Sequence, residues 1–178
     1  MFFADWSEGR ILALKTRPNG SSFKATAEVF LKGRPLNVCD LDVGIDGALY
    51  FCTGGRGTGG GVYRVVWNGR IPTKMLDYEN DLERAIRHPQ PNSAWARQNI
   101  AQLKTKLGRD WNKSLLGVAE ETRNPTKFRI RALNLMVLYG PMPSSDLLAK
   151  LATEGDPQLR ARVCDMCGLN GIQANVDC

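Results

Sequence analysis

The first 70 residues alternate between apolar and polar side chains in short runs, which is the pattern of β-strands. Residues 36–43, Leu-Asn-Val-Cys-Asp-Leu-Asp-Val, alternate in this way, as a strand with one buried face does. Asp46-Gly47 is a hairpin turn pair, and residues 48–52 are expected to form the returning strand. Four further strands are expected at residues 2–6, 9–15, 23–30 and 61–67.

This half of the chain also contains an internal repeat. Three pairs of short segments correspond at offsets of 48, 52 and 49 residues: 2–3 with 50–51, 9–14 with 61–66, and 19–20 with 68–69. A repeat of about 40 to 50 residues, built of four short strands, is typical of a β-propeller blade. We therefore expect the chain to begin at the second strand of one blade and to supply three strands of the next.

From about residue 93 the apolar positions follow the period of a helix, and Ser93 is expected to cap the first one. The segments 128–136 and 159–167 align without gaps, 31 residues apart. Single helices of this kind cannot bury their apolar stripe alone, so a stack of helical repeats is expected. The expected helices cover residues 93–103, 110–121, 126–139, 144–151 and 159–167.

Together these patterns predict an α+β chain made of two segments. Residues 1–72 are expected to be the last blades of an antiparallel β-propeller, left incomplete, and residues 73–92 a linker that includes a helix. Residues 93–178 are expected to be an all-α solenoid of HEAT-like helical repeats, truncated within a repeat. Broken blades with open edges are not stable alone, so the chain is expected to be a piece of a larger protein.

Composition and charge add few constraints. A hydrophobic content of 43% and a charged content of 24% are typical of globular domains. The net charge of +6 comes from a small excess of cations in each segment and is not gathered into a basic stripe, which argues against nucleic-acid binding. No run approaches the roughly 18 to 20 apolar residues of a membrane span. The N-terminus lacks the basic region of a signal peptide, so any export signal of a parent protein is expected upstream.

The five cysteines are expected to be free thiols, mostly buried, because their number is odd and their spacing irregular. Cys164 and Cys167 have the spacing of a c-type haem attachment motif, but Gly168 stands where that motif requires histidine. A structural zinc site needs four Cys or His ligands, and no second pair accompanies these two. No metal and no cofactor is therefore expected in this chain.

The glycine-rich residues 54–61 are expected to form a flexible loop between strands, because the phosphate-binding glycine loops lead into a helix. In a propeller blade this loop would bring Arg56 and Thr58 near Arg34 and Asn37. Two arginines placed there could hold an anionic sugar or a carboxylate. The alternative is that both arginines are solvated loop residues.

Three other sets of charged residues are candidate sites. Asp40 and Asp42 share one strand face and could be an acid/base or metal pair, or simply solvated or bonded to backbone amides. Two arginine pairs recur once per helical repeat and could form a ladder for an acidic partner, or pair internally with acids and helix ends. These pairs are Arg129 with Arg131 and Arg160 with Arg162.

Residues 36–67 (LNVCDLDVGIDGALYFCTGGRGTGGGVYRVVW) and the helical Pro-x-x-x-Arg-x-Arg-Ala segments resemble one known family. It is the large membrane-associated dehydrogenase-like proteins of planctomycetes and relatives. Those proteins join a propeller similar to the quinoprotein, PQQ-dependent sugar dehydrogenases, HEAT-like repeats and a C-terminal c-type cytochrome domain with a Cys-x-x-Cys-His motif. The resemblance spans nearly the whole chain and is most specific over residues 42–65.

The resemblance implies a parent protein, exported or periplasmic, that carries a PQQ-like quinone and haem c and oxidises a carbohydrate-like substrate. This chain lacks the Cys-x-x-Cys-His motif and most of the propeller, so no catalytic residue is assigned to it. Its expected partners are the missing blades and the cytochrome domain, with the helical repeats as a spacer or protein-docking surface. The alternative is a stand-alone protein-interaction module without a redox role.

Overall fold

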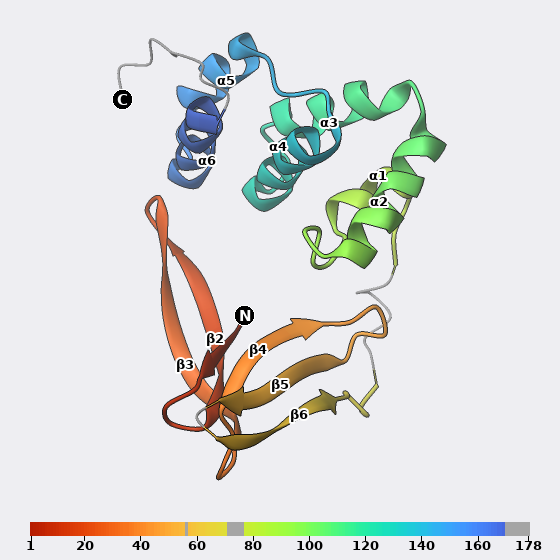
Figure 1. The fold of residues 1–178 in the computed structure, drawn as a ribbon. Helices are drawn as coiled ribbons and strands as arrows, with labels where there is room; N and C mark the ends of the chain where they lie inside the picture. The colour runs from red at the N-terminus through yellow and green to blue at the C-terminus, as the bar shows by residue number, and fades with distance from the viewer. Residues whose placement is uncertain (56, 71–76, 170–178) are drawn as a thin grey trace. The chain divides into compact units, whose positions relative to one another are not determined.

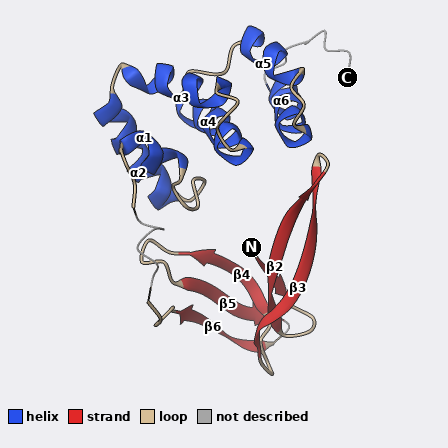
Figure 2. Ribbon diagram, turned by 180° about the vertical axis from the view of Figure 1, so that it is seen from behind, coloured by secondary structure: helices blue, strands red, loops and turns tan. Residues whose placement is uncertain are grey.

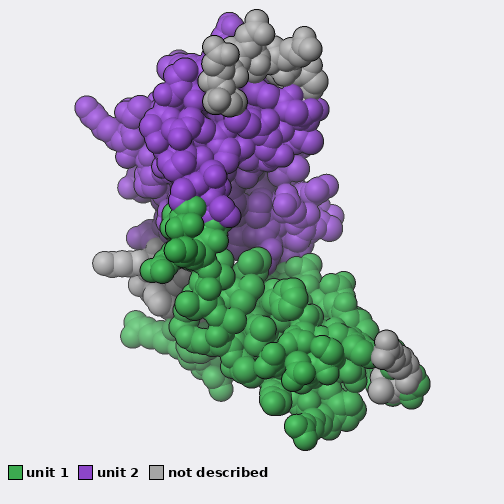
Figure 3. Space-filling view, turned by 90° about the vertical axis from the view of Figure 1, so that its left-hand side faces the viewer, with its two compact units in different colours: residues 1–19, 23–75 green, residues 20–22, 76–178 purple. Residues whose placement is uncertain are grey.

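The structure, a computed structural model, describes residues 1–55, 57–70 and 77–169. The chain divides into two compact units (Figure 3). The strand unit consists of residues 1–19 and 23–75, and the helical unit of residues 20–22 and 76–178. All strands precede all helices in the sequence (Figure 1), so the expected α+β class in two segments is confirmed.

The strand unit holds two three-stranded antiparallel sheets, each with its strands in sequence order. All six strands were expected, but β2 continues to Asn19, so the turn that follows it lies at Gly20 and Ser21. Gly20 has φ +61°, a conformation that suits glycine. The strands are β1 (Phe2–Asp5), β2 (Arg10–Asn19), β3 (Ser22–Lys32), β4 (Val38–Val43), β5 (Leu49–Gly55) and β6 (Thr58–Val65).

The turn between β4 and β5 forms at Asp46-Gly47, as the sequence predicts. Gly47 has φ +76°, and the Asp46 carboxylate accepts a hydrogen bond from the backbone N–H of Ala48 at 3.1 Å. Arg64 of β6 donates to the same carboxylate at 2.6 Å, and the Tyr50 hydroxyl donates to it at 2.9 Å. One aspartate therefore fixes the turn and ties all three strands of this sheet together.

The glycine-rich segment is not the flexible loop that the sequence analysis expected. Residues 54 and 55 end β5, and β6 begins at Thr58, with Thr53 paired to Gly61 and Gly55 to Thr58. Gly55 has φ +100° next to a register shift in this pair, a conformation open to glycine. Residues 54–55 and 59–61 therefore lie in two paired strands.

The core of the strand unit is small. Ile11, Val38 and Phe51 are buried together, and Phe51 stacks on Tyr63 with ring centroids 5.1 Å apart. The register of β4 shifts between Val38 and Asp40. Several half-buried residues pack around this cluster, namely Phe2, Ala4, Leu31, Leu36, Leu41 and Val65.

The helical unit has six helices among its described residues (Figure 2), one of which lies inside the expected linker. Ser93 caps the second helix by accepting from Ala96 N–H, as predicted, and Ser144 caps the fifth in the same way. The helices are α1 (Asp81–Ile86), α2 (Ala94–Leu107), α3 (Asp110–Glu120), α4 (Thr126–Tyr139), α5 (Ser145–Ala152) and α6 (Pro157–Leu169). None of the described helices has both the length and the apolar character that a membrane span needs.

These helices share one continuous core that includes α1. The repeat seen in the sequence corresponds to α4 and α6, which contact each other. Ala132 and Val163 are equivalent in that repeat and both are buried, as are Leu135 and Met166. Ile86 of α1 also belongs to this core. The helix that the sequence analysis placed in the linker is thus part of the helical unit.

Candidate functional site

The ligand site expected in the strand unit is described only in part. Arg56 lies outside the described residues, Thr58 begins β6, and Arg34 is exposed. Asn37 is half-buried, and its side-chain amide donates to the Trp6 carbonyl at 3.0 Å. Its own carbonyl accepts from Gly54 N–H at 3.0 Å. The structure thus brings Asn37 to the end of β5 and uses its amide in a structural contact.

Trp6 is a contact residue that the sequence analysis did not single out. Its indole N–H donates to the Gly54 carbonyl at 3.1 Å, and the same carbonyl accepts from the Cys39 thiol at 3.3 Å. Gly54, Trp6 and Asn37 together tie the end of β5 to the first sheet. No motif signalled this contact, because Trp6 and Gly54 are 48 residues apart in the chain.

Asp40 and Asp42 are exposed, and each accepts a hydrogen bond from the next backbone N–H, at 2.8 Å and 2.7 Å. This corresponds to the solvated, amide-bonded alternative. Within the part of the chain that the structure describes, no group of three or more His, Cys, Asp or Glu is placed to hold a metal. Cys39 is a free thiol as expected, and Cys39 and Cys164 are both exposed, so the expectation of mostly buried thiols is wrong for these two.

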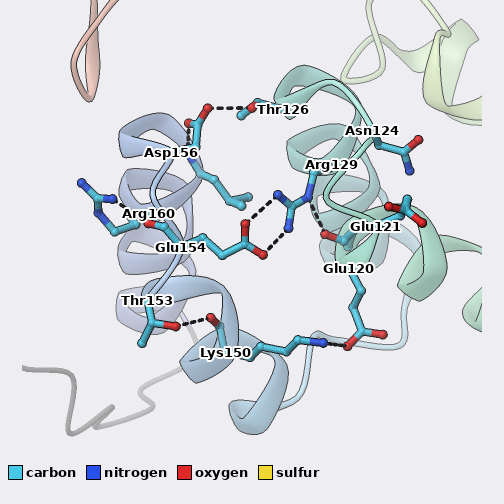
Figure 4. A network of polar contacts seen from close by, with 12 residues as sticks. Glu120, Glu121, Asn124, Thr126, Arg129, Lys150, Thr153, Glu154, Asp156 and Arg160 are labelled. Carbon is cyan, nitrogen blue, oxygen red and sulfur yellow. Dashed lines mark hydrogen bonds and ion pairs between the residues drawn. The ribbon is translucent and has the colours of Figure 1, made fainter.

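The first arginine of the repeat, Arg129, forms the centre of a buried polar network (Figure 4). Only 3% of the residue is exposed. Its guanidinium donates to both carboxylate oxygens of Glu154, at 2.9 Å and 2.5 Å, and to the Ala119 carbonyl at 2.8 Å. A bidentate pair of this kind fixes geometry as well as charge. Arg129 therefore joins α4 to the end of α3 and to the turn after α5.

The acids of this network are held in their charged forms. The hydrogen bonds from Arg129 lower the pKa of Glu154 below its ordinary value. The Thr126 hydroxyl donates to Asp156 at 2.6 Å and lowers the pKa of that carboxyl. The other oxygen of Asp156 accepts from the N–H groups of Gln158 and Leu159. Asp156 thus caps α6 in front of Pro157.

The remaining arginines of the repeat also bond inside the unit. Arg160 donates to the Glu154 carbonyl at 2.6 Å, and Arg162 donates to the Asn134 side chain at 2.7 Å. Arg131 donates to the carbonyl of His88, ahead of α2, at 3.1 Å. Of the two readings of the arginine rows, the geometry thus supports internal pairing over a ladder on the surface. Arg131, like Arg160, has a neutral backbone carbonyl as its partner.

A groove runs between α1 and α4 and consists of two adjoining hollows, of about 270 Å³ and 260 Å³. Both hollows are lined by Ile86, Arg87 and Phe128. The first is also lined by Glu79 and Glu83, together with the end of α3. The second is lined by two further cations, Lys127 and Arg131. We call this feature the α1–α4 groove.

The charges at the two ends of the α1–α4 groove are not equally satisfied. The Glu83 carboxylate pairs with Arg87 at 2.6 Å and accepts from Glu79 N–H at 2.7 Å, which lowers its pKa. Among the described residues, neither Lys127 nor Arg131 has a carboxylate partner, and Lys127 lies 4.9 Å from the Phe128 ring. Burial lowers the pKa of Arg131. Lys127 and Arg131 therefore lack a counter-charge at one end, and at the other end Glu83 is paired while Glu79 is not.

Comparison with protein-family models finds no match to this chain. The curated proteins and the solved structures likewise contain no significant match to it. The resemblance to the planctomycete dehydrogenase-like proteins thus stays a prediction from the sequence.

Proposed function

We propose that this chain is a non-catalytic section of a larger quinoprotein dehydrogenase-like protein. In this proposal the strand unit contributes the last blades of a β-propeller, and the helical unit is a HEAT-like spacer and docking surface. The haem c and the PQQ-like quinone of such a parent would be bound outside this chain. Its own Cys164 and Cys167 do not fit haem c, because they lie on α6 and are followed by Gly168.

The observation that carries the proposal is the large apolar surface of the strand unit. Val62 of β6 is 78% exposed, Phe23 of β3 is 58% exposed, and Trp67 after β6 is 76% exposed. An excess of exposed large apolar side chains on one unit favours a contact with a further partner. In a propeller each blade lies between two others, so both of its faces are covered. Further blades would cover these side chains.

The polar contacts of the helical unit support a structural role. Its buried ion pair between Arg129 and Glu154 joins consecutive helices, and Arg160 and Arg162 bond to neighbouring elements. These groups stabilise the stack and are not directed at a substrate. This is the arrangement that a spacer between a propeller and a further domain requires.

The second candidate is a stand-alone protein-interaction module without a redox role. One observation favours it, namely the α1–α4 groove with its cationic end. A groove in a helical stack can bind a protein segment whether or not further blades are present. The two candidates therefore differ in what they expect of the strand unit.

Limited proteolysis of the purified chain, with mass spectrometry of the resistant core, tests the proposal. We expect cleavage within residues 1–72 and survival of a core that begins between residues 76 and 93, because strands with uncovered apolar faces open locally. Hydrogen exchange on the same sample should show the same division. Equal protection of both units would contradict the proposal and favour the stand-alone module.

A further inference from the structure

The α1–α4 groove contains two cations that lack a carboxylate partner beside an apolar wall. Arg131 is half-buried, and its hydrogen bond runs to the neutral His88 carbonyl. Lys127 lies over the Phe128 ring, and Ile86 forms the wall of the same hollow. Removing a guanidinium from water without a counter-charge costs free energy, which an incoming anion would recover.

The rest of the groove narrows the choice of ligand. Of the two acids at its other end, Glu83 pairs with Arg87, whereas Glu79 has no cation partner among the described residues. The two hollows, of about 270 Å³ and 260 Å³, together fall within the range of roughly 300 to 1,000 Å³ over which ligand sites occur. Both are of a size for single side chains, and they adjoin along Ile86 and Phe128. Two neighbouring side chains of one peptide would fit this pattern better than a compact small molecule.

We infer that the α1–α4 groove binds an acidic peptide segment of a partner protein. A carboxylate of that segment pairs with Arg131 and Lys127, and an adjacent aliphatic side chain fills the hollow beside Phe128. Two cations next to an aromatic wall suit one or two carboxylates, whereas a nucleic-acid strand needs a longer basic track. The inference rests on the proposed docking role of the helical unit and is independent of the propeller.

The test is a titration of the ¹⁵N-labelled full-length chain, followed by NMR. Three capped tetrapeptides serve as probes, with the sequences Ser-Leu-Glu-Asp, Ser-Leu-Lys-Lys and Ser-Gly-Glu-Asp. We expect the first to shift the backbone amide signals of residues 86–87 and 127–131. The second should leave them in place because its charge is reversed, and the third should bind more weakly because it lacks the leucine.

Three variants locate the binding site. Arg131→Gln should weaken binding of Ser-Leu-Glu-Asp about ten-fold, because it removes a partly desolvated charge. Lys127→Ala should weaken it about three-fold, as expected for an exposed charge at a rim. Lys113→Ala is the matched control, since Lys113 is an exposed lysine on α3 outside the groove, and it should bind as wild type does.

Three results would overturn the inference. They are equal shifts from the acidic and the basic peptide, equal weakening by Lys127→Ala and Lys113→Ala, and tighter binding of a short oligothymidylate at the same amides. The amide signals of the α1–α4 groove belong to the helical unit. A failure of this inference is therefore distinguishable from a failure of the proposed function. The proposed function is tested by proteolytic cleavage within the strand unit.

Discussion

The two units bury their apolar side chains to very different extents. In the described part of the helical unit, 18 buried residues form one continuous cluster. In the strand unit, three residues do so, namely Ile11, Val38 and Phe51. Burial of apolar surface is the main stabilising contribution to folding. The helical unit therefore has the core of an independent domain, and the strand unit has only a small one.

The exposed surfaces show the reverse order. The strand unit exposes large apolar side chains on β3 and β6, including Phe23, Val29 and Val62 at more than half of their surface. In the described part of the helical unit the exposed large apolar side chains are fewer, namely Leu116 and Leu138 at 37%, Met142 at 45% and Leu169 at 66%. The strand unit thus leaves more large apolar side chains exposed than the described part of the helical unit does.

The largest expected effect comes from removing one core side chain in each unit. Phe51→Ala should lower the free energy of unfolding of the strand unit by about 4 kcal/mol, because it leaves a cavity in a core with few other members. Leu133→Ala should cost the helical unit about 3 kcal/mol. Both Phe51 and Leu133 are at most 4% exposed. Hydrogen exchange followed by NMR measures the protection of the backbone amides in each unit separately.

We expect Phe51→Ala to abolish protection of the strand amides at 25 °C while the helical amides stay protected. Leu133→Ala should leave the helices folded with a lower melting temperature. Wild-type protection of the strand amides in Phe51→Ala would mean that the strand unit has stabilising contacts beyond its small core. The inferred difference in stability between the two units would then be wrong.

A slightly smaller effect is expected from the ion pair of the helical unit. Glu154→Gln should lower the free energy of unfolding by about 3 kcal/mol, because it leaves the buried Arg129 guanidinium without a counter-charge. The exposed fractions of the two side chains are 21% for Glu154 and 4% for Arg129. Chemical denaturation followed by circular dichroism at 222 nm measures the change.

Lys150→Ala is the matched control for the ion-pair variant. Its partner is Glu120 at 2.8 Å, and the Lys150 side chain is 60% exposed. An exposed pair contributes about 0 to 1 kcal/mol. An equal loss of stability in Glu154→Gln and Lys150→Ala would show that burial of the Arg129 pair does not increase its contribution to the free energy of unfolding.

Acid should weaken the helical unit by a smaller amount. The pKa of Glu154 is lowered from its ordinary value of 4.5, and that of Asp156 from 3.8. A lowered carboxyl pKa adds stability at every pH above the ordinary value, and this is lost as the pH falls through the lower, folded-state value. The melting temperature of the helices should thus fall below about pH 4.5, and less steeply in Glu154→Gln. A parallel fall in that variant would contradict the assignment.

Much of the fold could be predicted because its signals are local. Ser93 in front of a helical pattern, and the Asp46-Gly47 pair between two strands, each report on a few neighbouring residues. The glycine-rich hairpin was missed for a physical reason. Glycine has no side chain to show a period, so the pairing of Thr53 with Gly61 leaves no trace in the pattern of side chains.

The α1–α4 groove could not be predicted from the sequence. Arg87 and Arg131 are far apart in the chain, and they come together because the short helix α1 packs on α4. A helix of six residues is too short to show a helical period clearly. The arginine repeat was misleading in another way, since Arg129 binds the carboxylate of Glu154 and its equivalent, Arg160, binds the carbonyl.

The smallest change in stability is expected from Val62→Thr. This variant also tests directly whether the strand unit exposes more apolar surface than the helical unit. Val62 is 78% exposed and pairs with Cys52 in the sheet. Threonine keeps the β-branched shape, so the free energy of unfolding should change by less than about 0.5 kcal/mol. Binding of the apolar dye ANS should nevertheless fall, because part of the uncovered face becomes polar. The control Leu116→Gln, in the helical unit, should leave dye binding unchanged. Equal losses in both variants would mean that the exposed apolar surface is not concentrated in the strand unit, and the case for neighbouring blades would lose its main support.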